Sequence, residues 1–215
     1  MDKKNIFMVD LETTGFNNFG RDVILQISIC QISDDKMVKE VYSSLVRYLK
    51  FENDNFTKYV NNCWWMSEKG LRYERDFRYA PDIREVWNEI RSILEGEFVI
   101  SWNMKFDFGD FLDRIDKGIF MDYNLQKINY KKLKCPMVIA TKHVGVLNYK
   151  GGLKWPKLIE AANFYKVNQD FGDNMYHDAS IDTQVASIVF LKMIELEHYD
   201  LSGYPELIGF VKNVI

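Results

Sequence analysis

The segment that decides the fold reads Asn5-Ile6-Phe7-Met8-Val9-Asp10-Leu11-Glu12-Thr13-Thr14-Gly15. Residues 5–10 are almost all apolar, which is typical of a central strand covered on both faces. Asp10 and Glu12 stand two positions apart, and because strand side chains alternate, both carboxylates leave the sheet on the same face. Two like charges at this distance raise at least one pKa unless a cation lies between them. A solvated strand end before the Gly15 turn also explains the pair.

Hydrophobic patterning on either side of this segment predicts strands first and alternating helices and strands later. Strands over Val23–Ser33 and Met37–Tyr48 form a meander, and a mixed, aromatic-rich section follows over Phe51–Tyr79. The later predicted elements are a helix from Pro81 to Leu94, a strand over Glu97–Trp102, and helices over Phe106–Lys117, Lys157–Tyr165 and Ala179 to Leu196. This order predicts an α/β fold, a mixed sheet with helices on its faces. No repeat or linker interrupts the chain, so residues 1–215 are expected to form one domain.

Composition and charge narrow the class of protein. The 215 residues are 47% hydrophobic and 27% charged, which is typical of a folded globular chain and argues against disorder. The net charge is −3, so the chain lacks the strongly basic surface that binding to a long nucleic-acid duplex requires. No apolar run approaches the ~18 residues of a membrane helix, no signal-peptide pattern is present, and the three cysteines are scattered. We therefore expect a cytoplasmic protein with no membrane association.

A further acid, Asp182, stands on a helical face where an apolar residue is expected. It shares that face with Ala186, Val189 and Met193. A core-facing acid is costly unless it is paired or bound to a metal, although a place in the first helical turn also favours negative charge. His177 lies five residues earlier on a different face, so it meets Asp182 only from a preceding loop. There it is either a proton acceptor with a pKa near neutrality or an ordinary surface histidine.

Other polar residues are less informative by themselves. Asp107 begins a predicted helix, where aspartate is a good cap. A solvated arginine face over core aromatics is favoured for residues 72–79, although the same residues with two tryptophans would suit a stacking and phosphate-binding surface. That group consists of Arg72, Arg75, Arg78, Tyr73, Phe77, Tyr79, Trp64 and Trp65. The lysine cluster over residues 127–134 is interpreted as a solvated loop.

Taken together, the motifs resemble the DEDDh, or DnaQ-like, family of 3′–5′ exonucleases. The three family motifs stand here as Asp10-Leu11-Glu12-Thr13-Thr14-Gly15, as Asn103-Met104-Lys105-Phe106-Asp107, and as His177 followed five residues later by Asp182. A chance match to the five fixed residues of the first motif is expected in roughly one such chain in ten thousand. The motifs span residues 10–182, so the resemblance covers most of the chain. One departure is Trp102, which stands where many members have histidine.

The resemblance implies an RNase H-like fold, with a mixed five-stranded sheet flanked by helices. It also implies a metal-dependent 3′–5′ exonuclease that removes 5′-mononucleotides from the 3′ end of single-stranded nucleic acid, with DNA favoured over RNA. The implied ligands of two Mg²⁺ or Mn²⁺ ions are Asp10, Glu12, Asp107 and Asp182, and His177 would be the general base. The implied substrate contacts are Thr13, Thr14, Gly15, Phe16, Trp102, Asn103 and Phe106.

Three other functions stay open at this point. The chain is also compatible with an RNA-trimming exoribonuclease, with a proofreading subunit that requires a polymerase as a separate partner, and with a catalytically silent nucleic-acid-binding adapter. The presence of all five candidate catalytic residues argues against the adapter. Discrimination between DNA and RNA depends on pocket shape around a 2′-hydroxyl, which residue spacing does not determine.

Overall fold

A computed structural model describes residues 5–16, 20–167 and 177–214. Its centre is a mixed five-stranded sheet of order β3-β2-β1-β4-β5. The strands are β1 (Ile6–Thr13), β2 (Ile24–Ile32), β3 (Val38–Leu45), β4 (Phe98–Ile100) and β5 (Lys131–Lys132). β1 pairs antiparallel with β2 and parallel with β4, and β4 pairs parallel with β5. The predicted fold class is confirmed.

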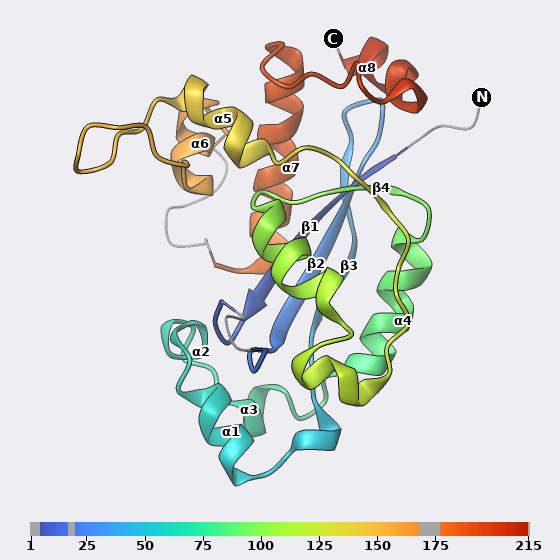
Figure 1. The fold of residues 1–215 in the computed structure, drawn as a ribbon, viewed down its shortest axis with the longest axis vertical. Coiled ribbons are helices and arrows are strands. Elements are labelled where there is room, and N and C mark those ends of the chain that lie inside the picture. Colours follow the sequence, from blue (N-terminus) through green and yellow to red (C-terminus); the bar gives the residue numbers. More distant parts are fainter. Residues whose placement is uncertain (1–4, 17–19, 168–176, 215) are drawn as a thin grey trace.

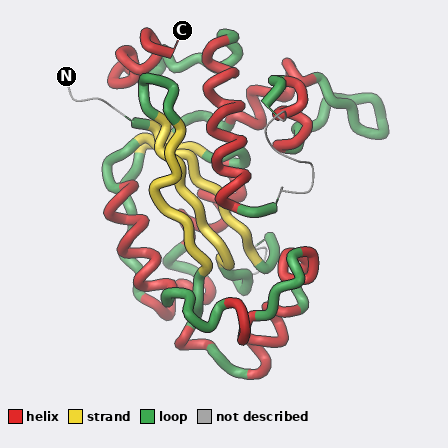
Figure 2. The backbone as a smooth tube through the Cα atoms, turned by 180° about the vertical axis from the view of Figure 1, so that it is seen from behind, coloured by secondary structure: helices red, strands yellow, loops and turns green. Residues whose placement is uncertain are grey.

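Helices cover both faces of this sheet (Figure 1). α4 (Ile83–Leu94) packs on one face, and α7 (Ala179–Glu195) packs on the other, against β1, β2 and β3 (Figure 2). The shorter helices are α1 (Asp54–Asn61), α2 (Trp64–Glu68), α3 (Tyr73–Asp76), α5 (Pro136–Val144), α6 (Leu158–Phe164) and α8 (Ile208–Val214). α6 packs against α7 and α5 against α6, so the three helices form one layer.

The side-chain alternation of β1 separates two hydrophobic cores. Phe7, Val9 and Leu11 pack into the core that contains α4. Ile6 and Met8 pack into the core that contains α7. Continuing the same alternation directs Asp10 and Glu12 toward α7. The strand therefore changes from apolar to acidic on one face only, and that face lies beneath the start of α7.

Two helices begin where the sequence indicates. The Asp82 side chain accepts a hydrogen bond from Arg84 N at 3.2 Å and caps α4. The Asp178 side chain accepts from Ser180 N at 3.0 Å and caps α7. Because α7 is covered by the sheet on one side and by α6 on another, most of its residues are buried, which explains why apolar residues occupy most of its surface.

The predicted helix over Phe106–Lys117 is wrong in type. Residues Lys105–Phe111 form a π-helix, followed by 3₁₀ turns over Leu112–Arg114 and Gly118–Tyr123. Apolar spacing does not separate i→i+5 from i→i+4 hydrogen bonding, and π-turns occur frequently at functional sites. Asp107 is accordingly no helix cap, because it lies buried inside the π-helix. The two-residue β5 and the helices α1, α2, α3, α5 and α8 were not located from the sequence.

The arginine group is a solvated face over core aromatics, as favoured from the sequence. The lysine cluster over residues 127–134 is solvated, but the loop prediction is wrong for Lys131 and Lys132, which form the edge strand β5. Arg72, Arg75 and Arg78 are exposed, whereas the interleaved Tyr73 and Phe77 are buried in the core. Trp65 is also buried, so the stacking surface built from this whole group does not exist. Charged residues on an edge strand such as β5 prevent pairing with another sheet, and Lys131 and Lys132 form ion pairs with Glu206 and Asp113. Among the described residues, none of the helices has the length and apolarity of a membrane span.

Candidate active site

Carboxylates from three separate segments converge at the C-terminal end of β1. Asp10 and Glu12 come from β1 itself. Asp107 comes from the π-helix that follows β4, and because β4 runs parallel to β1, this segment begins at the same edge of the sheet. Asp182 comes from the first turn of α7. The topology therefore brings together all four acids that the resemblance implies.

Glu12, His177 and Asp182 form a tight group within this cluster. Each offers one potential ligand atom, and these atoms lie within 4.8 Å of one another. The backbone N–H of His177 donates to Asp182 Oδ2 at 3.0 Å. Asp107 and Asp182 each retain a buried Oδ1 atom with no hydrogen-bond partner among the described residues. Buried oxygens without partners are costly, and oxygen ligands are those that Mg²⁺ prefers, so the donor set fits hard divalent cations.

Burial raises the pKa of every carboxyl group in the cluster. The pKa of Asp10 lies well above its usual value because of burial and then repulsion from Asp107, Asp182 and Glu12. Burial raises the pKa of Glu12 to about 8, with repulsion from Asp182 as the next cause. The pKa values of Asp107 and Asp182 rise to about 7, mainly through burial. A cation among these groups would favour their ionised forms.

His177 stands just before α7 and is held from three sides. Its φ of 64° is left-handed, which is uncommon for a residue with a side chain. Its carbonyl accepts a hydrogen bond from Trp65 Nε1 at 2.8 Å, and its N–H donates to Asp182. The Trp64 ring meets the imidazole edge-on, with ring centroids 4.8 Å apart. Burial and nearby Lys69 lower the pKa of His177, which favours the neutral imidazole that accepts a proton.

The turn after β1 is fixed by a buttress made by residues 22 and 23, which directly precede β2. Thr14 Oγ1 donates to Asp22 Oδ1 at 3.0 Å and accepts from Val23 N at 3.0 Å. The Tyr59 hydroxyl donates to the same Asp22 oxygen at 2.5 Å. A Cβ atom on Gly15 would lie 2.5 Å from Asp22 Oδ1, so a side chain at this position would displace the buttress. Glycine is therefore required by the close approach of Asp22.

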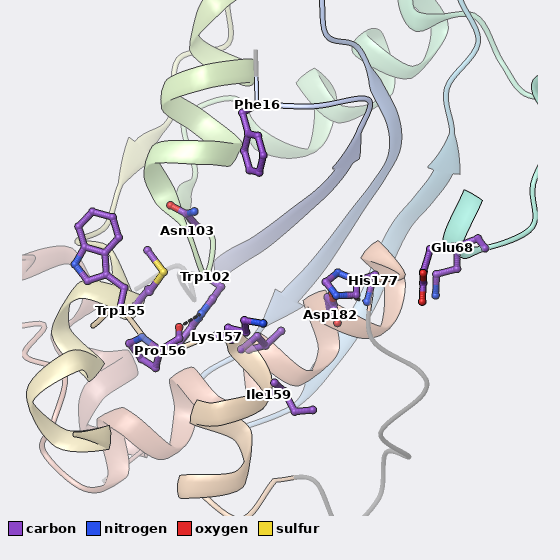
Figure 3. A pocket seen from close by; sticks show the side chains of 13 residues that line it. Phe16, Glu68, Trp102, Asn103, Trp155, Pro156, Lys157, Ile159, His177 and Asp182 are labelled. Atoms are coloured by element: carbon purple, nitrogen blue, oxygen red, sulfur yellow. Dashed lines mark hydrogen bonds between the residues drawn. The ribbon is translucent and has the colours of Figure 1, made fainter. Parts of the chain in front are cut away.

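Two cavities meet at Phe16, His177 and Asp182. The smaller, of about 440 Å³, is lined by Asp10, Glu12, Thr13, Thr14, Gly15, Phe16, Trp64 and Phe106, among others. The larger, of about 880 Å³, extends along Trp102 and Asn103 to residues 155–159 (Figure 3). Asp107 is only 2% exposed and is not among the residues that line either cavity. Phe16 is 73% exposed and packs edge-on against Phe106, with ring centroids 6.1 Å apart.

Trp102 has a supporting contact as well as a place in the larger cavity. Most of its side chain is buried, and its Nε1 donates to Pro156 O at 3.2 Å. The indole therefore ties the end of β4 to the segment that begins α6. Trp102 and Pro156 face each other across this contact in Figure 3.

Sequence reasoning missed the residues that hold α7 in place. Gln26 lies opposite Glu12 on β2, and its side chain accepts from Ala179 N at 3.2 Å and donates to Asp178 Oδ1 at 3.3 Å. A buried amide within an apolar strand was the available signal for Gln26. The bond from Trp65 to His177 joins residues 112 positions apart, and no local pattern indicates it.

Comparisons with known proteins agree with this architecture. No family model matches the sequence. The 3′–5′ exonuclease DinG of Bacillus subtilis (strain 168) is 23% identical over 197 residues, which cover 91% of this chain and 18% of that protein. Exonuclease I of E. coli in complex with a dA16 oligonucleotide has a TM-score of 0.60 at 12% identity, over 90% of this chain and 41% of that chain.

A moderately thermophilic exonuclease I from Methylocaldum szegediense has a TM-score of 0.62 at 12% identity, over 95% of this chain and 42% of that chain. The chain therefore spans less than half the length of these solved structures and 18% of the curated relative. The chain therefore shares the fold of exonuclease I, and its similarity to DinG agrees with the resemblance to DnaQ-like 3′–5′ exonucleases. The resemblance seen in the motifs is confirmed as a similarity to exonucleases, among them DinG and exonuclease I.

Proposed function

We propose that residues 1–215 form one exonuclease domain that hydrolyses the terminal phosphodiester bond at the 3′ end of single-stranded nucleic acid. It releases 5′-mononucleotides and prefers DNA to RNA. The convergence of three buried carboxylates and the half-buried Asp10 with His177 at the end of β1 carries this proposal. Similarity to a 3′–5′ exonuclease supports it, as does the oligonucleotide bound to E. coli exonuclease I.

Two Mg²⁺ or Mn²⁺ ions are the cofactors of this proposal. Asp10, Glu12, Asp107 and Asp182 would hold them, and the unpartnered Oδ1 atoms of Asp107 and Asp182 support this assignment. Asp10 is the natural shared ligand because the other three acids all contribute to raising its pKa. When bound, such a pair of ions stabilises the attacking and leaving oxygens of an in-line displacement.

The remaining residues position the substrate and move a proton. His177 accepts the proton of the attacking water, because its lowered pKa favours the neutral form. Phe16 and Phe106 offer apolar rings at the smaller cavity for the terminal base. The buttressed turn over Thr13, Thr14 and Gly15 receives the 3′-terminal sugar.

A digestion time course tests the proposed function. Single-stranded DNA and RNA of matched sequence, labelled at the 5′ or at the 3′ end, are incubated with Mg²⁺, Mn²⁺ or EDTA. We expect stepwise, metal-dependent shortening from the 3′ end, faster for DNA than for RNA. A folded protein that binds the strand but hydrolyses it with neither metal would instead be an adapter. Co-purification with a polymerase tests the proofreading role.

A further inference from the structure

One long segment of this acidic chain carries only positive charge. Residues 123–159 contain eight lysines and neither aspartate nor glutamate, although the whole chain has a net charge of −3. This segment begins before β5, continues through α5 and ends within α6. Four of these lysines belong to the solvated cluster over residues 127–134, and Lys154 is ion-paired with Glu160. The exposed Lys150 and Lys157 are therefore the charges that indicate an anionic partner.

Within this segment, residues 145–155 form an arm that projects from the body of the protein. Figures 1 and 2 both show it extending away from the sheet beyond α5 and α6. The arm is a short hydrogen-bonded ribbon, with Asn148 N donating to Gly152 O at 2.8 Å and Lys154 N donating to Val146 O at 2.9 Å. The Asn148 side chain also accepts from Lys150 N at 2.8 Å and closes the tip. The arm is therefore a built element with a defined shape.

The arm exposes large apolar and aromatic side chains. Tyr149 at the tip is 92% exposed and Trp155 at the base is 60% exposed. Leu147 and Leu153, which pair across the ribbon, are more than half exposed. These side chains bury little surface in the fold, so their contribution to its stability is small. Exposed apolar side chains grouped in this way typically mark a contact surface.

The arm holds a cation over one of its exposed aromatic rings. The Lys150 ammonium lies over the Tyr149 ring, 5.4 Å from its centroid. At the base of the arm, the exposed Lys157 follows Trp155 by two residues. Aromatic faces with adjacent cations are the combination that binds bases by stacking and phosphates by charge in single-stranded nucleic acid. An apolar protein partner would not account for the absence of acidic residues.

The base of the arm opens directly into the candidate active site. Trp155 and Lys157 line the larger cavity, whose opposite end is formed by His177 and Asp182. Figure 3 shows Trp155 and Pro156 on one side of this cavity, Asp182 and His177 further along it, and Lys157 between the two pairs. A strand whose 3′ end occupies the smaller cavity can therefore continue through the larger cavity to the arm.

We propose that the arm binds the single-stranded segment upstream of the 3′ end, with bases stacked on Tyr149 and Trp155 and phosphates held by Lys150 and Lys157. This inference rests on the proposed function and extends it. It predicts that long strands are preferred over very short ones, because only long strands reach the arm. It also explains how an acidic chain retains a polyanionic substrate.

Strand binding measured without hydrolysis tests the arm. Fluorescence anisotropy with 5′-labelled DNA strands of three and about 20 nucleotides is recorded in EDTA for the full chain and for the double variant Tyr149→Ala, Lys150→Ala. Stacking on one aromatic side chain contributes ~1–3 kcal/mol per base, so affinity for the long strand should fall about tenfold. The slope of log affinity against log salt concentration should become shallower by about 0.7 for each phosphate that the variant no longer neutralises. Affinity for the short strand should change far less.

The matched control is the double variant Tyr79→Ala, Arg78→Ala. Tyr79 is 87% exposed and carries the Arg78 cation 5.3 Å from its ring centroid, so this variant removes the same kinds of group between α3 and α4. It should leave the affinity for both strands unchanged. Equal losses in the two double variants, or an unchanged affinity for the long strand in the arm variant, would overturn the proposal.

Two further outcomes separate this inference from the proposed function. In the first, the protein binds long strands through the arm and yet hydrolyses none of them. That outcome would refute the proposed exonuclease activity and support strand binding by the arm. Analytical sedimentation of both variants measures their oligomeric state and so tests whether the arm contacts a second copy of this chain. An oligomeric state that changes only in the arm variant, with strand binding unaffected, would assign the arm to contact between copies of this chain and refute strand binding.

Discussion

The end of β1 and the arm differ in the sign and in the burial of their charges. At the end of β1 the charges are negative, buried and close together, and their pKa values are raised as a result. In the arm and the base of α6 they are positive, spread along a ribbon and mostly exposed. Buried like charges destabilise the fold and persist only where a ligand compensates for them. Exposed lysines are solvated at little cost, so they can bind an anionic partner but do not indicate a catalysed reaction.

Removing one central charge should produce the largest effect. In Asp10→Asn, hydrolysis of a single strand should fall by about a thousandfold or more, because the variant lacks the proposed shared ligand of the two ions. The metal-free variant should unfold at the same or a higher temperature than the parent at pH 8, since repulsion with its neighbours is relieved. Labelled-strand digestion and thermal unfolding measure both quantities. Near-normal hydrolysis would defeat the assignment of Asp10.

Replacing the proposed base should slow turnover without weakening strand binding. His177→Asn should lower kcat by about a hundredfold or more, the usual contribution of a general base. Asparagine is chosen because it tolerates the left-handed backbone that His177 adopts, with φ of 64°. At saturating Mg²⁺, the fall of kcat below pH 6.5 that protonation of His177 causes in the parent should disappear in the variant. A variant that retains the pH profile of the parent would remove His177 from this role.

The acidic cluster should make the metal-free protein less stable as pH rises. The native pKa values of Glu12, Asp107 and Asp182 are raised to about 8, 7 and 7, so the native state binds protons that the unfolded state has released. The free energy of unfolding should therefore fall as pH increases from about 4 to 8, on the order of several kcal/mol.

Denaturant unfolding at a series of pH values in EDTA and in Mg²⁺ measures this dependence. Mg²⁺ should stabilise the protein more at pH 8 than at pH 6, because ionised carboxylates bind it. A metal-free protein whose stability increases over this pH range would contradict the electrostatic description of the site.

The smallest expected effect concerns the support of His177. Trp65→Phe removes the hydrogen bond to the His177 carbonyl, which contributes about 1 kcal/mol, and should lower kcat about fivefold. Trp87→Phe is the control, since buried Trp87 donates in the same way to Gln126 O at 2.7 Å, away from both cavities. Both variants should lose similar stability by denaturant unfolding. Equal kcat in the two variants would reduce Trp65 to a core residue.

Local sequence patterns predicted the elements whose physical causes are local. The strands predicted over Val23–Ser33 and Met37–Tyr48 match β2 and β3 closely. Their sequences are rich in β-branched and apolar residues, and turn residues stand at their ends. The long helix at Ala179 begins where predicted because Asp178 caps it. The two-residue β5 was not predicted, because it forms through pairing with β4 and its residues have no strand preference of their own.

The sequence by itself determined the acidic pair on β1, the glycine turn, and the order of the three motifs, because these depend on strand alternation and residue identity. Only the tertiary structure decided which partners surround them. Parallel pairing of β1 with β4 brings the π-helix of Asp107 to the same edge, and the packing of α7 places Asp182 beside Glu12. The same folding buries Trp65 against His177 and leaves Tyr149 in solvent. Burial and distance depend on contacts between remote segments, and sequence spacing does not specify them.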